Sequence, residues 1–393
     1  MRFVFFALLI FFFYRVGNFI PLPFVLVDGA FHQIDFLSQV SKTGIINQQA
    51  LQRMSLFSLG IVPYITSGIV IQLIKFIFSE TSYGASLKDR KFLSSQTLFF
   101  TLGISILQSF MFSRYALGLN FDVMHAFIIV SCLVAGSFIT VWFSKLITSF
   151  GYGNGASIII MFGIVEYLFI SSSDIFSSVD DGTTSISIVF TQFIYFICVI
   201  FIVCLMESAY RPLKLIYPSQ RNKYGFEQGK KTDILPLKIN NSGVLPLIFS
   251  MSFSSIFSIF LAPFLFERFS IDITYLMTII NLFFMVFFVF FYTPFVLNTE
   301  DIAKNLKKSS ILLENRRPGD VTKQYIDSVI NKLNYIAVLY LGSMIVFPDF
   351  FKYLGLNVVI SGVSCVILVS VIMDIIRRVQ YSRYSEKFQK LVN

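Results

Sequence analysis

Long apolar stretches, separated by shorter polar segments, follow one another along almost all of the 393-residue chain. A helix of about 20 apolar residues crosses a hydrocarbon core of about 30 Å. About ten stretches approach this length, and the shorter ones leave a range of about nine to eleven. The pattern therefore predicts an all-α integral membrane protein. The expected spans are residues 3–20, 61–78, 92–113, 123–148, 156–171, 185–207, 243–265, 273–297, 334–347 and 357–376.

The composition agrees with a membrane class. Hydrophobic residues make up 55% of the chain and charged residues 13%, whereas a soluble domain carries about 25% charged residues. Water cannot hydrate the whole of a surface so poor in charge, but such a surface can face lipid. The net charge of +9 is explained better by basic loops on one side of a bilayer than by nucleic-acid binding.

The basic residues are distributed unevenly between the two sides that the spans define. Cytoplasmic loops carry an excess of Lys and Arg. If the N-terminus is inside, most of the 31 basic residues lie in inner segments. We therefore expect both termini to face the cytoplasm or an equivalent compartment. The outer segments hold five basic residues, which are Lys42, Arg53, Arg114, Arg268 and Lys352.

Two polar segments between spans are much longer than a connection requires. Residues 208–240 and 298–333 both lie on the inner side and contain charges of both signs. Long loops of this kind are more often interaction surfaces than tethers, because a tether needs only a few residues. We expect them to be docking surfaces, with solvated connectors as the alternative.

Two of the predicted spans begin with the same arrangement of glycine and proline. Pro63 opens the second span and Pro246 opens the seventh, each three residues after a glycine. Proline removes a backbone donor and breaks or kinks a helix, so we expect helix breaks at Pro63 and Pro246; lipid tolerates such breaks only where protein or a cavity satisfies the freed groups. Matching segments in two halves favour an inverted repeat around a central pathway. We expect an N-terminal half of residues 1–171 and a C-terminal half of residues 172–393, each with five spans.

The sequence shows no motif of an enzyme, a metal site or a nucleotide-binding loop. The two histidines, His32 and His125, lie in or near outer loops, and no cluster has metal-ligand spacing. We therefore expect no catalytic residue, no metal and no cofactor. Any driving force for transport must come from a partner or from an ion gradient.

Charged residues inside the predicted spans are few. Glu166 lies well within the fifth span, and it is a candidate either for a transport role or for an interhelical hydrogen bond. Lys75, Glu207 and Asp374 lie at inner ends of spans, where we expect them to reach water. The pathway is thus predicted to be apolar, which suits a gated pore better than a proton relay.

Several motifs occur in order along the chain. They are R-V-G-N-F-I-P-L-P (15–23), S-L-G-I-V-P-Y-I (58–65), G-Y-G-N-G-A-S-I (151–158), L-P-L-K-I-N (235–240), and E-D-I-A with N-L-K-K (300–308) followed by R-P-G (317–319). In these motifs and their spacing the chain resembles the SecY family of protein translocation channels. Segment 361–364 reads S-G-V-S where the family has G-G-T-S, which leaves open a divergent, accessory or organelle-encoded member.

The resemblance implies a clamshell of two inverted five-helix halves around an hourglass pore. It places a lateral gate between the second and seventh spans, the two spans that begin near Pro63 and Pro246. It also places a plug at about residues 49–59. It also implies a constriction ring of apolar side chains that excludes water and ions when closed. The ring positions that match are Ile65, Ile69, Ile160 and Ile248, with a looser match on the tenth-span side at Leu341 or Met344.

The resemblance also implies partners. Arg317 occupies the position of the family's loop arginine, where a SecA-type motor ATPase or a ribosome docks. Lys307, Lys308 and Lys238 lie in the same motifs. SecE-like and SecG-like small subunits, signal sequences, unfolded polypeptides and membrane lipid complete the expected partners. The expected location is the bacterial cell membrane, with a plastid or mitochondrial membrane as alternatives.

Two other functions fit parts of the pattern. A secondary transporter or lipid flippase with inverted repeats would share the ten spans and paired prolines, but it calls for more charge within the membrane. A scaffold or insertase without a pore would share the loops but would need no apolar ring.

Overall fold

The computed structural model describes residues 2–24, 54–78, 87–117, 122–150, 153–180, 186–216, 233–254, 273–314, 316–353 and 361–392. Helices dominate this part of the chain. They are α1 (Arg2–Phe19), α5 (Val62–Phe78), α6 (Leu87–Leu117), α7 (Val123–Ser149), α8 (Gly155–Asp180), α9 (Ile186–Ser208), the helix Leu245–Ser254, α11 (Ile273–Val296), α12 (Thr299–Lys308), α13 (Asp320–Tyr353) and α14 (Gly362–Val392).

Each of the ten expected spans coincides with one of these helices. Among the described residues, five helices are long and apolar enough to cross a membrane, and they lie in α6, α7, α9, α11 and α13. Shorter apolar helices lie in α1 and α5, in α8 and in helix 245–254. The tenth, α14, begins apolar and continues as a charged helix through the expected tail. The predicted all-α membrane architecture is confirmed, and the C-terminal part of span 243–265 lies outside the described residues.

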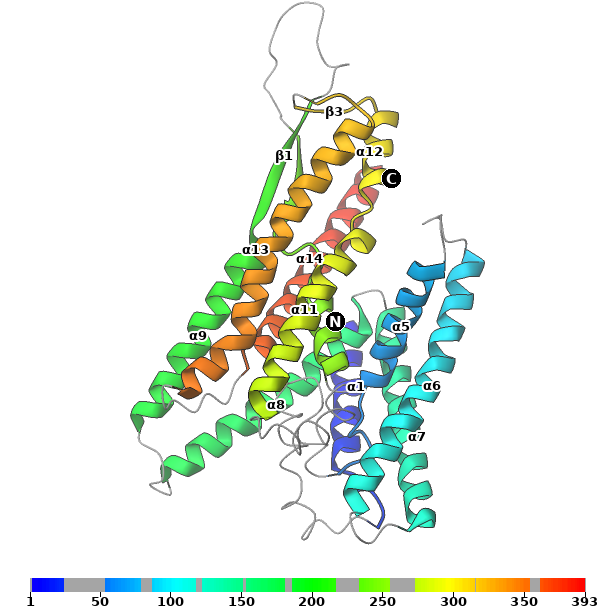
Figure 1. Ribbon diagram of the computed structural model, residues 1–393, viewed down its shortest axis with the longest axis vertical. Coiled ribbons are helices and arrows are strands. Elements are labelled where there is room, and N and C mark those ends of the chain that lie inside the picture. Colours follow the sequence, from blue (N-terminus) through cyan, green and yellow to red (C-terminus); the bar gives the residue numbers. More distant parts are fainter. Residues whose placement is uncertain are drawn as a thin grey trace, which may run out of the picture.

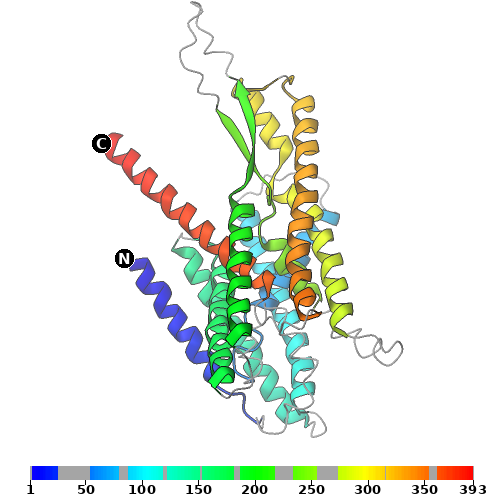
Figure 2. The same ribbon diagram turned by 90° about the vertical axis from the view of Figure 1, so that its left-hand side faces the viewer.

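The helices pack as two groups that follow the chain. In the first group α5 packs on α6, α6 on α7, and α7 on both α8 and α1; in the second, α13 packs on α11 and α14, and α14 on α9. Contact between α8 and α14 joins the groups. Figures 1 and 2 show the first group at one end of the long axis, and α1 and α14 projecting from the same side. The expected boundary at residue 171 lies inside α8, because α8 continues to Asp180.

The repeated glycine and proline arrangement of the second and seventh spans corresponds to two equivalent helix starts. Gly60 and Gly243 both have positive φ, +52° and +67°, a conformation that glycine adopts without strain. Pro63 and Pro246 are each the second residue of the helix that follows, where the missing N–H is not needed. They therefore mark helix starts and do not break a helix interior. The carbonyl after each glycine accepts the same pair of N–H groups: Tyr64 and Ile65 to Ile61 at 3.1 and 3.2 Å, and Leu247 and Ile248 to Val244 at 3.0 and 3.2 Å.

The described parts of the two long polar segments pack together and include a small sheet that the sequence pattern does not predict. The strands are β1 (Tyr210–Ile216), β2 (Ile234–Lys238) and β3 (Leu312–Leu313), in the order β2-β1-β3 with antiparallel pairing. Buried leucines from all three strands pack on the first turns of α13. Figure 1 shows the sheet and α12 together at one end of the molecule. We name the sheet, α12 and the first turns of α13 the loop unit.

Candidate functional site

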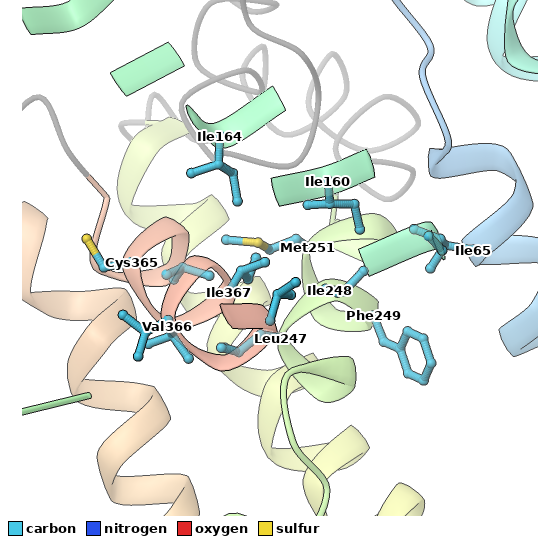
Figure 3. Packing of buried hydrophobic residues seen from close by; sticks show 14 of the residues in the cluster. Ile65, Ile160, Ile164, Leu247, Ile248, Phe249, Met251, Cys365, Val366 and Ile367 are labelled. Atoms are coloured by element: carbon cyan, nitrogen blue, oxygen red, sulfur yellow. The ribbon is translucent and has the colours of Figure 1, made fainter. Parts of the chain in front are cut away.

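Isoleucines from both halves meet in the apolar interior. Ile65 of α5, Ile160 of α8 and Ile248 of helix 245–254 are buried in one hydrophobic cluster. Figure 3 shows Ile160 and Ile248 near the centre of the view and Ile65 to one side of them. Ile65 and Ile248 are equivalent in the repeat, since each lies two residues after the proline of its helix start. The inverted arrangement thus brings two copies of one position to the seam between the halves.

The other expected ring residues are not related by the repeat in the way that Ile65 and Ile248 are. Ile69 lies one helical turn after Ile65 and is buried in the same cluster. Leu341 and Met344 are fully buried but belong to α13, and the Met344 carbonyl oxygen packs against the start of α14 at Gly362. The tenth helix, α14, contributes Ile367, which Figure 3 shows near Ile248.

Some interior residues were missed by sequence reasoning. Ile164 follows Ile160 by one turn of α8, and Met251 follows Ile248 on helix 245–254; both belong to the cluster. The spacing of three and four residues could have indicated them. The isoleucine and methionine side chains named here are apolar and offer no strong hydrogen-bonding group to a passing chain.

The segment before α5 is attached to the end of α1. Residues 54–60 contain the described part of the expected plug, and residues 49–53 lie outside the described residues. Leu22 N donates to Met54 O at 2.8 Å, and Leu56 N donates to Ile20 O at 2.9 Å. These bonds form a short antiparallel bridge that fixes the segment beside α1.

Two glycines allow residues 54–60, named here the plug segment after the expected plug, to approach their neighbours closely. A methyl group at Gly17 of α1 would overlap the ring of Phe57, and one at Gly136 of α7 would overlap the carbonyl oxygen of Leu56. The Thr140 hydroxyl has two acceptors within hydrogen-bond distance, the Gly60 carbonyl oxygen at 3.0 Å and the Ser137 carbonyl oxygen of its own helix at 2.7 Å. We name Gly17, Gly136 and Thr140 the plug seat.

Two buried carboxyl groups make interhelical or loop hydrogen bonds. Asn18 Nδ2 donates to Glu166 Oε2 at 2.8 Å, which joins α1 to α8. Of the two roles considered for Glu166, the structure shows the hydrogen bond. Glu207 is also buried, at 4% exposure, and accepts from Asn240 at 2.8 Å. The expectation that Glu207 reaches water was wrong, because the segment after β2 covers it; Asp374 is exposed as expected.

Three of the expected docking residues are exposed on the loop unit or on the segment that joins its elements. Lys307 and Lys308 are exposed at the end of α12, and Arg317 is exposed between β3 and α13. Lys238 pairs with Tyr210 at the far end of β1 from β3, which pairs at Leu215. Five residues separate Tyr210 from Leu215, which is about 17 Å along a strand. The structure therefore does not group Lys238 with Arg317.

Ion pairs order the outer face of the loop unit. The side chain of Asn298 caps α12 by accepting from the N–H groups of Glu300 and Asp301 at 3.2 Å. Lys304 and Lys323 lie 2.6 and 3.2 Å from the Glu300 carboxylate. Their hydrogen bonds hold the pKa of Glu300 below its usual value. Because these groups are exposed, they shape the surface more than they stabilise it.

Comparisons with known proteins agree with this architecture. The family model described as SecY matches residues 55–376. A protein translocase subunit SecY from Porphyra purpurea is 30% identical over 402 residues, covering 98% of this chain and 97% of that protein. A subunit of the same name from Pseudomonas aeruginosa is 29% identical over 421 residues, covering 100% of this chain and 92% of that protein.

Solved structures share the fold at lower identity. A SecY structure described for its plug domain, which stabilises the closed state of the translocation channel, has a TM-score of 0.70 at 15% identity, covering 96% of this chain and 91% of that one. Sec61 in the canine ribosome–channel complex has a TM-score of 0.62 at 16% identity, covering 97% and 92%.

Proposed function

Because this chain belongs to the SecY family, we propose that it is the central channel subunit of a protein translocase. In this role it passes unfolded secretory polypeptides across a membrane and releases transmembrane segments sideways into lipid. The protein is thus a conduit and not an enzyme. A secondary transporter or flippase is not favoured, because the family match covers most of the chain and Glu166 is held by Asn18.

The observation that carries this proposal is that Ile65 and Ile248 are both buried in one apolar cluster to which the two halves contribute. The two residues occupy equivalent positions in opposite halves, on the two helices that begin at Pro63 and Pro246. An apolar closure between two separable halves can seal against ions and yet part for a chain. The proposed ring consists of Ile65, Ile69, Ile160, Ile248, Leu341 and Met344, and the proposed lateral gate lies between α5 and helix 245–254.

The proposed docking surface is the loop unit. Arg317, Lys307 and Lys308 are exposed on it, and Arg suits a bidentate carboxylate or a phosphate. The partner is a SecA-type motor ATPase or a ribosome; the ribosome is supported by the canine Sec61 complex, which shares the fold. SecE-like and SecG-like subunits accompany the channel. The bias of Lys and Arg supports cytoplasmic termini, in a bacterial cell membrane or its plastid counterpart.

The test is cross-linking during transport. Single cysteines replace Ile65 or Ile248 in a chain whose four native cysteines are replaced by serine, and a secretory precursor is stalled in transit. We expect cross-links from both positions to the middle of the precursor. A cysteine at Phe99, which is 77% exposed on α6, is the matched control and should not cross-link.

If the precursor is transported but neither Ile65 nor Ile248 cross-links to it, the substrate does not pass through the proposed ring. The transporter or scaffold function would then be favoured. Dependence on a separate ATPase, and not on an ion gradient, distinguishes the channel from the transporter.

A further inference from the structure

A buried joint connects the end of α9 to the segment that leads into helix 245–254. Asn240 Nδ2 donates to Glu207 Oε1 at 2.8 Å, and both residues are at most 4% exposed. The Ser242 hydroxyl donates to Asn240 Oδ1 at 3.4 Å. From the other side, Arg377 Nη2 of α14 donates to the Glu207 backbone carbonyl at 2.9 Å. Side chains from two separate segments, Asn240 after β2 and Arg377 of α14, therefore bind the last turn of α9.

The joint lies between the loop unit and the proposed gate. On one side, Ile239 N donates to Ala209 O at 3.1 Å, which closes the membrane end of the β1–β2 hairpin. On the other side, Gly243 turns with positive φ into the helix that carries Ile248. Only Asn241 and Ser242 separate Asn240 from that glycine. A displacement of the hairpin thus reaches the gate helix through this short segment.

The Asn240–Glu207 hydrogen bond couples the two segments that it joins. A buried carboxylate is unfavourable unless it is hydrogen-bonded or near positive charge. Asn240 supplies that donor. Breaking a buried hydrogen bond leaves a polar group unpaired, which costs about 1–3 kcal/mol. The segment at Asn240 is therefore expected to move with the end of α9.

We propose that Glu207 and Asn240 are positioning residues that make helix 245–254 follow the loop unit when a cytoplasmic partner docks. This inference rests on the proposed function. Docking shifts the sheet and the α9 terminus to which β1 is directly joined. The Asn240–Glu207 bond carries that shift to Gly243, where the helix start can pivot. Without the bond, the partner still docks, but the gate helix does not follow.

Reversing the donor and acceptor tests the joint. Glu207→Gln keeps a carbonyl oxygen that can accept from Asn240, and we expect near wild-type behaviour. Asn240→Asp removes the amide donor, and Asn240→Leu removes it without supplying a second carboxyl group that can share a proton with Glu207. In the double variant Glu207→Gln with Asn240→Asp, the new amide donates to the new carboxylate, so function should return. Asp122→Asn is the matched control, because it makes the same carboxylate-to-amide change at an exposed residue of the other half, before α7, which is outside the joint.

The measurements are made on full-length variants in lipid vesicles. Import of a purified precursor is driven by a purified SecA-type motor, and motor binding to the same vesicles is titrated. We expect Asn240→Asp and Asn240→Leu to slow import about tenfold or more, a loss in the range of one charged hydrogen bond, with motor affinity within about twofold of wild type. The double variant should recover import to within about threefold of wild type.

Three results would overturn the proposal. They are wild-type import by Asn240→Leu, no recovery in the double variant, and loss of motor binding in parallel with import. If the wild-type chain imports nothing, the proposed function fails, and hydrogen exchange then decides on the joint alone. Exchange at the Leu247 and Ile248 amides that is about tenfold faster in Asn240→Asp, and restored in the double variant, supports the joint; unchanged exchange refutes it.

Discussion

Replacing Gly136 by alanine should displace the plug segment and make the resting channel leak. A methyl group at this position overlaps the Leu56 carbonyl oxygen, which belongs to the backbone and cannot rotate away. The segment must withdraw by roughly 1 Å or more before ordinary contact is restored. Overpacking of this kind costs about 1–3 kcal/mol. The strain is relieved when the plug leaves, so it acts against the closed state.

The magnitude follows from this cost. A change of about 1–3 kcal/mol shifts an equilibrium about 5- to 150-fold. A channel that is open about 1% of the time would then be open about 5% to 60% of the time, which is a large change in conductance. The assay is ion conductance of the purified channel in planar bilayers, without partner or precursor. Thermal unfolding in detergent is measured in parallel, to show that the variant is folded.

The control is Gly103→Ala on α6. Gly103 has no atom within 4 Å of an added methyl group, so this variant has the same change in chemistry without the overlap. Both substitutions gain up to about 1 kcal/mol of helix propensity, and the difference between them isolates the clash. If Gly136→Ala and Gly103→Ala conduct equally little, the plug segment does not seal the pore from the seat described here.

Three further predictions concern the ring, the docking surface and the buried carboxyl. Ile65→Asn or Ile248→Asn should raise resting conductance and relax the signal-sequence requirement, because the closed state loses apolar contact; strict rejection of precursors with defective signals by both variants would contradict the ring. Arg317→Glu should abolish import while membrane insertion of the chain stays normal. In motor-binding titrations, the affinity of Arg317→Lys should lie between those of the wild type and Arg317→Glu. Asn18→Ala should lower stability by about 1–3 kcal/mol, because Glu166 loses its donor; an unchanged unfolding midpoint in detergent would contradict that cost.

The membrane helices could be predicted from sequence because burial in lipid is dictated by local composition. About 20 consecutive apolar residues indicate a span wherever they occur. The helix starts at Pro63 and Pro246 were also readable, since glycine and proline act on their own backbone. What these signals give is the position of each element along the chain, together with the equivalence of Ile65 and Ile248.

Contacts between distant segments could not be predicted in this way. β1 pairs with β3 across about a hundred residues, and strand signals as short as Leu312–Leu313 do not stand out from a loop. The burial of Glu207 depends on Asn240, which is 33 residues away. The start of α13 at Asp320 was missed because its first turns are polar on one side and covered by the sheet on the other.

The equivalent helix starts of the two halves are bound by side chains from different elements. In the N-terminal half, Thr140 of α7 lies against the carbonyl of Gly60, beside the plug segment. In the C-terminal half, Glu207 of α9 binds Asn240, three residues before Gly243, beside the loop unit. Because the halves are inverted, one attachment lies toward the plug and the other toward the docking surface. In the proposed channel, the repeat therefore allows one pair of helices to be closed at the plug segment and moved from the loop unit.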